Sequence, residues 1–127
     1  MSKSDTLIDG IIGAEVAIKI LILWGATQVQ SCSILAISVN EYKNVFAKNL
    51  SFIFEPNSEQ LDRISFVLNI HSCLRTMFSN PKNCYGYMAM INNNDYLCGR
   101  TPLQIISNGC LQDIKDVYIC IEPLVTE

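Results

Sequence analysis

Apolar residues recur at steps of three and four along most of this chain. The longest such run follows Ser58, where apolar or weakly polar side chains return on one side of an expected helix. Its positions are Leu61, Ile64, Val67, Leu68, His71, Leu74 and Phe78. No segment of useful length alternates apolar and polar residues with a period of two. The pattern therefore predicts an all-α fold.

Capping residues divide the N-terminal part into helices. We expect the first helix to begin at Asp9 or Gly10 and to run to about Trp24. Two further short helices are expected at about 28–35 and 39–48, each preceded by a capping-box pair. These pairs are Thr27 with Gln30 and Ser38 with Glu41.

The C-terminal part is divided in the same way. Asn57–Ser58 opens the long helix, and Asn80–Pro81 opens a helix that should reach about Ile91. An asparagine-rich loop follows, and then a short helix that ends at Gly109 and begins with a capping box of Thr101 and Gln104 and a first-turn Pro102. The last helix is expected at about 111–120, with Leu111, Ile114, Val117, Tyr118 and Ile121 as its apolar stripe. We therefore predict a compact bundle of six to seven helices, with a helix-turn-helix-like part at 1–55 and a second helical part at 56–127.

The second and third expected helices have the dimensions of a DNA-binding helix-turn-helix. In that motif the second helix presents its N-terminal residues to base edges, while cations reach phosphates. The candidate DNA-contacting residues are Gln28, Asn40, Lys43, Asn44 and Lys48. The turn holds Ala36 where glycine is usual. The alternative is a three-helix core that keeps this shape without binding DNA.

Composition limits the classes of function. The net charge of −3 provides no bulk attraction to nucleic acid. The six cysteines form no CxxC pair and the single histidine has no ligand-like neighbours, so we expect reduced, buried thiols, no metal and no cofactor. The apolar stretch Val16–Trp24 is too short to cross a bilayer. Without a secretory signal, the protein is expected in the cytoplasm, and no catalytic motif predicts an enzyme.

The order of features after Leu61 resembles the C-terminal domain of the Xre/MbcA/ParS antitoxin family. A helix ends in Arg75 and Phe78, and a proline-started helix and an asparagine-rich loop follow it. The sequence GRTPL at 99–103 then opens a short helix, which precedes Gly109 and a final aliphatic and acidic helix. The similarity extends over about 61–122. The chain has Tyr85 and Tyr87 where the family often has a tryptophan.

The resemblance implies the antitoxin of a type II toxin–antitoxin pair. Toxins paired with this family usually carry a RES-type domain, which consumes NAD or transfers ADP-ribose. The antitoxin then neutralises its cognate toxin by binding over the active site, and the pair represses its own promoter at operator DNA. These statements are expectations drawn from the resemblance.

The final helix and tail, about 113–127, are the expected toxin-binding segment. Pro123 is expected to end the helix and to leave an extended, exposed tail. The candidate toxin-binding residues are Arg100, Asp113, Asp116, Glu122, Leu124, Val125 and Glu127. The alternatives are a frayed terminus and an Arg100 that only fixes the loop before it.

Two other functions remain open. One is a helix-turn-helix transcription regulator without a toxin partner, and the other is a stand-alone helical interaction protein. In each case we expect at least a homodimer, because the first and fourth helices carry more apolar surface than a small monomer readily hides.

Overall fold

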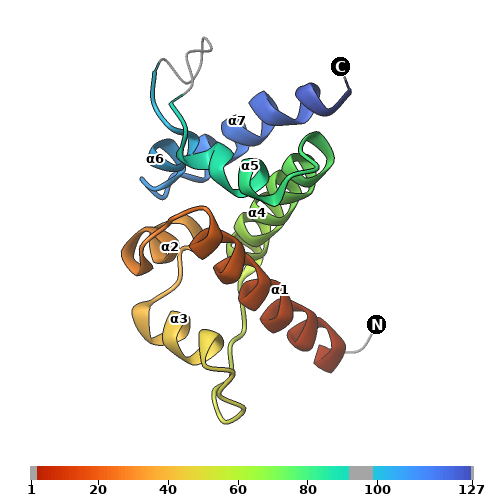
Figure 1. Ribbon diagram of the computed structural model, residues 1–127. Coiled ribbons are helices and arrows are strands. Elements are labelled where there is room, and N and C mark those ends of the chain that lie inside the picture. The colour runs from red at the N-terminus through yellow and green to blue at the C-terminus, as the bar shows by residue number, and fades with distance from the viewer. Residues whose placement is uncertain (1–2, 92–98, 127) are drawn as a thin grey trace.

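The computed structural model describes residues 3–91 and 99–126, and it is all-α there (Figure 1). Seven α-helices and two short 3-10 helices make up this part of the chain, which confirms the predicted fold class. In chain order they are α1 (Lys3–Leu23), α2 (Gln28–Leu35), α3 (Val39–Phe46), α4 (Ser58–Met77), α5 (Pro81–Gly86), η1 (Tyr87–Ala89), α6 (Pro102–Ile106), α7 (Leu111–Ile121) and η2 (Glu122–Thr126). The asparagine-rich loop at 92–95 lies outside the described residues.

The capping boxes form as the sequence predicted. Thr27 Oγ1 accepts a hydrogen bond from the amide of Gln30 at 3.1 Å, and the Gln30 side chain accepts one from the amide of Thr27 at 2.8 Å. Ser38 and Glu41 make the same reciprocal pair before α3. Such caps stabilise a helix by about 1 kcal/mol each, because they satisfy amides that have no partner inside the helix. They fix where these short helices begin.

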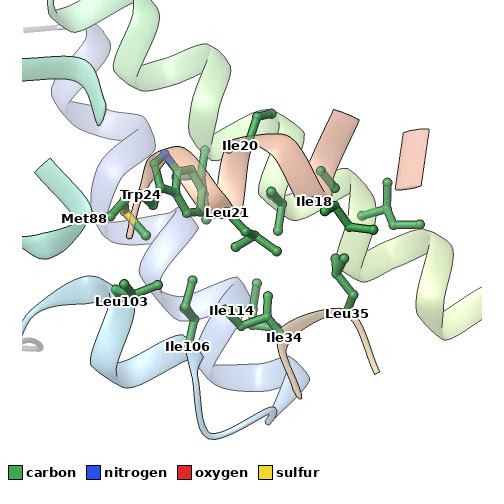
Figure 2. Packing of buried hydrophobic residues seen from close by; sticks show 14 of the residues in the cluster. Ile18, Ile20, Leu21, Trp24, Ile34, Leu35, Met88, Leu103, Ile106 and Ile114 are labelled. Atoms are coloured by element: carbon green, nitrogen blue, oxygen red, sulfur yellow. The ribbon is translucent and has the colours of Figure 1, made fainter. Parts of the chain in front are cut away.

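One hydrophobic core joins the two halves of the chain. Side chains of α1 meet those of α2, η1, α6 and α7 around Trp24 and Leu21, both of which are almost completely buried (Figure 2). The long helix α4 packs along α1 and supplies Ile64, Val67 and Ile70 to the same cluster. The core therefore contains residues from both sides of the expected boundary at 55/56, and the division into two parts stays a prediction.

Four of the expected helix boundaries are wrong. The short helix α6 ends at Ile106, three residues before the expected Gly109. The first helix begins at Lys3, and Gly10 lies inside it, where a Cβ atom would come within 2.8 Å of Pro56 Cγ. That glycine permits close packing and does not mark a helix start. The third helix ends at Phe46, and Lys48 adopts a left-handed backbone with φ of 57°. The helix from Pro81 ends at Gly86 and continues only as the 3-10 turn η1.

The buried face of α4 is rotated from the predicted one. Ile64, Val67 and Leu74 are buried as expected, but Leu61, Leu68, His71 and Phe78 are only half-buried. Their place in the interior is taken by Gln60, Arg63 and Ile70. Two polar side chains thus enter the interior beside α2, and their role is described below.

Candidate partner-binding surfaces

The α2–α3 unit keeps helix-turn-helix connectivity without a glycine in its turn. Ala36 occupies the left-handed region with φ of 55° and ψ of 46°, and its amide donates to the carbonyl of Cys32. A residue with a Cβ atom is strained in this conformation by roughly 1–2 kcal/mol. Contacts from other elements must therefore hold the turn in place.

Two side chains of α4 hold that turn. Gln60 Nε2 donates to the carbonyl of Ala36 at 2.8 Å. Arg63, which is only 6% exposed, donates from Nη1 to the carbonyls of Ser33 and Ile34 at 3.3 and 3.1 Å. Carbonyls in the last turn of a helix have no intrahelical partner, so the guanidinium satisfies groups that would otherwise be buried without one. Sequence patterns did not single out Arg63 or Gln60 for this role.

The turn before α7 packs against the same end of α2. Gly109 has φ of 81°, and a Cβ atom there would lie 3.0 Å from the carbonyl oxygen of Ser33. The short helix α6 carries the predicted cap, because Thr101 and Gln104 form a capping box and Pro102 follows in the first turn. The α6–α7 corner and Arg63 thus meet at one carbonyl of α2.

The predicted DNA-contacting residues do not form a free cationic surface. Asn40 and Lys43 are exposed on α3, and Gln28 is half-buried at the start of α2. Asn44, however, donates its side-chain amide to the carbonyl of Asn40 at 2.8 Å. Lys48 lies after the end of α3 and pairs with Glu15 of α1 at 3.3 Å. Of the two lysines expected to contact DNA, Lys43 is exposed on α3 and Lys48 is paired with α1.

Glu15 is the centre of this charge cluster. Hydrogen bonding from Lys19 and, secondarily, from Lys48 lowers the pKa of the Glu15 carboxyl, which opposes the rise that desolvation alone would cause. The carboxylate therefore stays ionised and keeps both lysines as partners. A phosphate would have to compete with Glu15 for Lys48.

The outer face of α7 carries polar, charged and aliphatic side chains. Its inner face buries Ile114, Val117 and Ile121 as predicted, whereas Leu111 and Tyr118 of the expected stripe are only half-buried. On the outer side Gln112, Lys115 and Ile119 are exposed, and Gln112 Nε2 donates to Asp116 Oδ1 at 2.8 Å. Asp113 accepts from the side-chain amide of Asn108 at 2.6 Å, which ties it to the corner before the helix.

The expected extended tail is wrong. Residues 122–126 form the 3-10 helix η2, which continues α7 and packs against α4. Pro123 fits this turn because its fixed φ is compatible with a helical first turn. Glu122 and Leu124 are exposed and Val125 is half-buried, whereas Glu127 lies outside the described residues. The candidate segment is thus a formed surface on the body of the protein.

Not all of the predicted toxin-binding residues come together. Asp116, Glu122 and Leu124 follow one another along the end of α7 and η2. Arg100 is exposed before α6, which packs beside α7, and η2 follows the last residue of that 11-residue helix (Figure 1). Figure 1 shows α6, which follows Arg100, at the end of α7 opposite to η2, and a helix of the length of α7 spans about 16 Å.

A groove between α4 and α7 adjoins this surface and was not anticipated. It has a volume of about 620 Å³ and is lined by Asp62, Ser65, Phe66, Asn69, Leu111, Gln112 and Lys115. Phe66 forms part of its wall and contacts Tyr118 of α7 with ring centroids 5.8 Å apart. Residues of α4 that face this groove are three and four positions apart, a spacing that could have indicated a shared face.

The thiols and the histidine provide little chemistry. The five cysteines of the described residues are free, and burial raises the pKa of the thiols of Cys32, Cys73, Cys84 and Cys120. Cys110 is exposed, which corrects the expectation of buried thiols throughout. His71 stacks on Tyr85 at 5.5 Å, and burial, with a smaller effect of Arg75, lowers its pKa. Within 3–91 and 99–126 no group of three or more potential ligands is placed to hold a metal ion.

Comparisons with known proteins add no relative. Neither protein-family models, nor curated proteins, nor solved structures give a match to this chain. Among the helices that the structure describes, none is both long enough and apolar enough to span a lipid bilayer. The resemblance to the Xre/MbcA/ParS antitoxins therefore stays a prediction from the residues quoted for it.

Proposed function

We propose that this protein is the antitoxin of a type II toxin–antitoxin pair and that it binds its cognate toxin through the outer surface of α7 and η2. One observation carries the proposal. Ile119 is 50% exposed and Leu124 is 39% exposed, and both lie on this surface near the carboxylates of Asp116 and Glu122. Protein-binding surfaces commonly have an apolar centre with a rim of polar and charged groups.

Because η2 is folded and packs on α4, the toxin is bound by a preformed surface and not by an extended tail. An extended tail would have to become ordered when it enters a cleft, and that ordering costs free energy. A formed 3-10 turn is already ordered, so binding loses less conformational entropy. The antitoxin thus covers the toxin's active-site cleft with a rigid edge, and its acidic groups occupy space that an anionic substrate such as NAD uses.

The class of toxin comes from the resemblance alone. It is a RES-type enzyme that consumes NAD or transfers ADP-ribose. The antitoxin itself is a binding protein in this proposal and carries out no reaction.

Single charged substitutions test the proposed surface better than deletion of the tail, because deletion also removes the packing of η2 on α4. Ile119→Asp and Leu124→Asp each replace an exposed aliphatic side chain with a charged one, whose burial in an interface costs solvation free energy, and each should weaken toxin binding at least tenfold in calorimetry. Ile53→Asp is the matched control, since Ile53 is exposed in the connection between α3 and α4. Equal affinity of all three variants and the wild type would remove α7–η2 from the interface.

A helix-turn-helix regulator is the second candidate function, with or without a toxin partner. The capped α2–α3 pair with Asn40 and Lys43 exposed on α3 favours it. Operator binding by the antitoxin would also give autorepression. Fluorescence anisotropy with promoter DNA at two salt concentrations tests this candidate, because phosphate contacts make affinity fall with salt. Lys43→Ala should weaken binding if α3 contacts DNA, and no measurable binding at low salt excludes the candidate.

A further inference from the structure

The outward face of α1 carries an apolar stripe with one lysine in its middle. Ile12, Val16 and Leu23 are 53%, 42% and 53% exposed, and Lys19 is exposed between them. These four positions are separated by four, three and four residues, which is the spacing of a coiled-coil seam. The seam is about 17 Å long, since eleven helical steps separate its ends.

The lysine in the middle of the stripe has a carboxylate partner on its own helix, and Lys48 after α3 pairs with the same carboxylate. Lys19 Nζ lies 3.1 Å from Glu15 Oε1, one turn earlier on the flank of the stripe. Each α1 helix therefore carries one cation and one anion near the centre of an otherwise apolar face. A second helix of the same sequence complements this arrangement when it runs in the opposite direction.

The stripe continues into a shallow hollow at the C-terminal end of α1. Leu23 and Trp24 form one side of the hollow, Pro81, Lys82 and Tyr85 of α5 form another, and its volume is about 390 Å³. At the opposite end, the N-terminal turns of α1 extend beyond the other helices (Figure 1). Isolated helical turns are marginal in water, so a packing partner would stabilise this end.

We propose that two copies of this chain associate through α1 in an antiparallel arrangement. In this arrangement Ile12 of each copy packs against Leu23 of the other, and Val16 packs against the aliphatic stem of Lys19. The projecting N-terminal turns of each α1 reach the hollow beside Leu23 of the second copy. The proposal does not depend on the antitoxin function, because it uses a different surface.

The direction follows from the position of Lys19. Parallel helices would place Lys19 against Lys19 in the middle of the seam, where like charges repel. Antiparallel helices place each Lys19 beside an aliphatic residue and near the Glu15 carboxylate of the other copy. The same sequence then provides both the apolar and the charged complement, which favours a second copy over an unrelated helix.

Sedimentation equilibrium of the full chain tests the proposal. The wild type should shift from monomer to dimer as the protein concentration is raised over about two orders of magnitude. Leu23→Glu should raise the dimer dissociation constant at least tenfold. Leu50→Glu is the matched control, because Leu50 is 99% exposed but lies after α3. This control should associate like the wild type. Circular dichroism checks that each variant keeps its helix content.

A paired substitution tests the direction. In the antiparallel arrangement the double variant Ile12→Lys with Leu23→Glu places opposite charges together and should recover association relative to Leu23→Glu alone. In a parallel arrangement the same variant places like charges together and stays dissociated. A monomeric wild type, an unaffected Leu23→Glu variant, or a double variant that fails to recover would each overturn the proposal.

Discussion

Replacement of Arg63 by methionine should destabilise the protein by about 3 kcal/mol, because the guanidinium satisfies two carbonyls at the buried end of α2. Methionine keeps much of the aliphatic bulk of arginine and removes the donors. The carbonyls of Ser33 and Ile34 then lose their charged partner. An unsatisfied buried polar group costs roughly 1–3 kcal/mol.

Two opposing contributions set the magnitude of this loss. Removal of a buried cation recovers part of its desolvation cost, which reduces the loss below the sum of two hydrogen bonds. The ion pair with Glu59 contributes less than about 1 kcal/mol, since the Glu59 side chain is 56% exposed. A loss of about 3 kcal/mol is a large share of the 5–15 kcal/mol by which a typical domain is stable.

Urea unfolding followed by circular dichroism measures this loss. Arg75→Met is the matched control, because Arg75 lies exposed on the same helix and its replacement should change the free energy of unfolding by no more than about 0.5 kcal/mol. Glu59→Gln should cost less than about 1 kcal/mol and so separate the ion pair from the carbonyl contacts. A loss below about 1 kcal/mol for Arg63→Met would refute the reasoning that these carbonyls depend on Arg63.

Three further predictions concern single positions. Ala36→Gly should stabilise the protein by about 0.5–1 kcal/mol in urea unfolding, because glycine relieves the left-handed strain, whereas the control Ala47→Gly, at φ of −77°, should not stabilise. Gly109→Ala should destabilise by about 2 kcal/mol, since its Cβ would press on the Ser33 carbonyl at positive φ; a neutral result would contradict the close approach of the two turns. The folded-state pKa of His71 is lowered, so its stabilising contribution is complete above the unfolded pKa of about 6.5 and is lost as pH falls below it. His71→Phe should therefore lose less stability between pH 7 and pH 5 than the wild type, and parallel pH profiles would exclude this role.

Local chemistry explains which parts of the fold were predictable. Thr27, Ser38 and Thr101 each act on residues three positions away, so the sequence alone indicates these helix starts. Arg63 and Gln60 act on carbonyls 24 to 30 residues away, and no local pattern shows where such a side chain points. Their polarity on an otherwise apolar face was the one available clue.

The buried side of α7 was predictable from the sequence, whereas the path of the tail after it was not. The stripe of α7 follows from helical periodicity, and its buried side was predicted from Ile114, Val117 and Ile121. The path of the tail does not follow from Pro123, because a proline after a helix permits either an extended chain or a new helical turn. Packing of η2 on α4 decides between them, and that contact depends on the whole fold.

The most direct test of the proposed function is co-expression with the toxin encoded beside its gene. The wild-type protein should restore growth and should copurify with the toxin, whereas the double variant Ile119→Asp with Leu124→Asp should do neither while it keeps wild-type helix content. Ile53→Asp should behave as the wild type. Failure of the wild-type protein to relieve toxicity or to bind the toxin would contradict the antitoxin proposal.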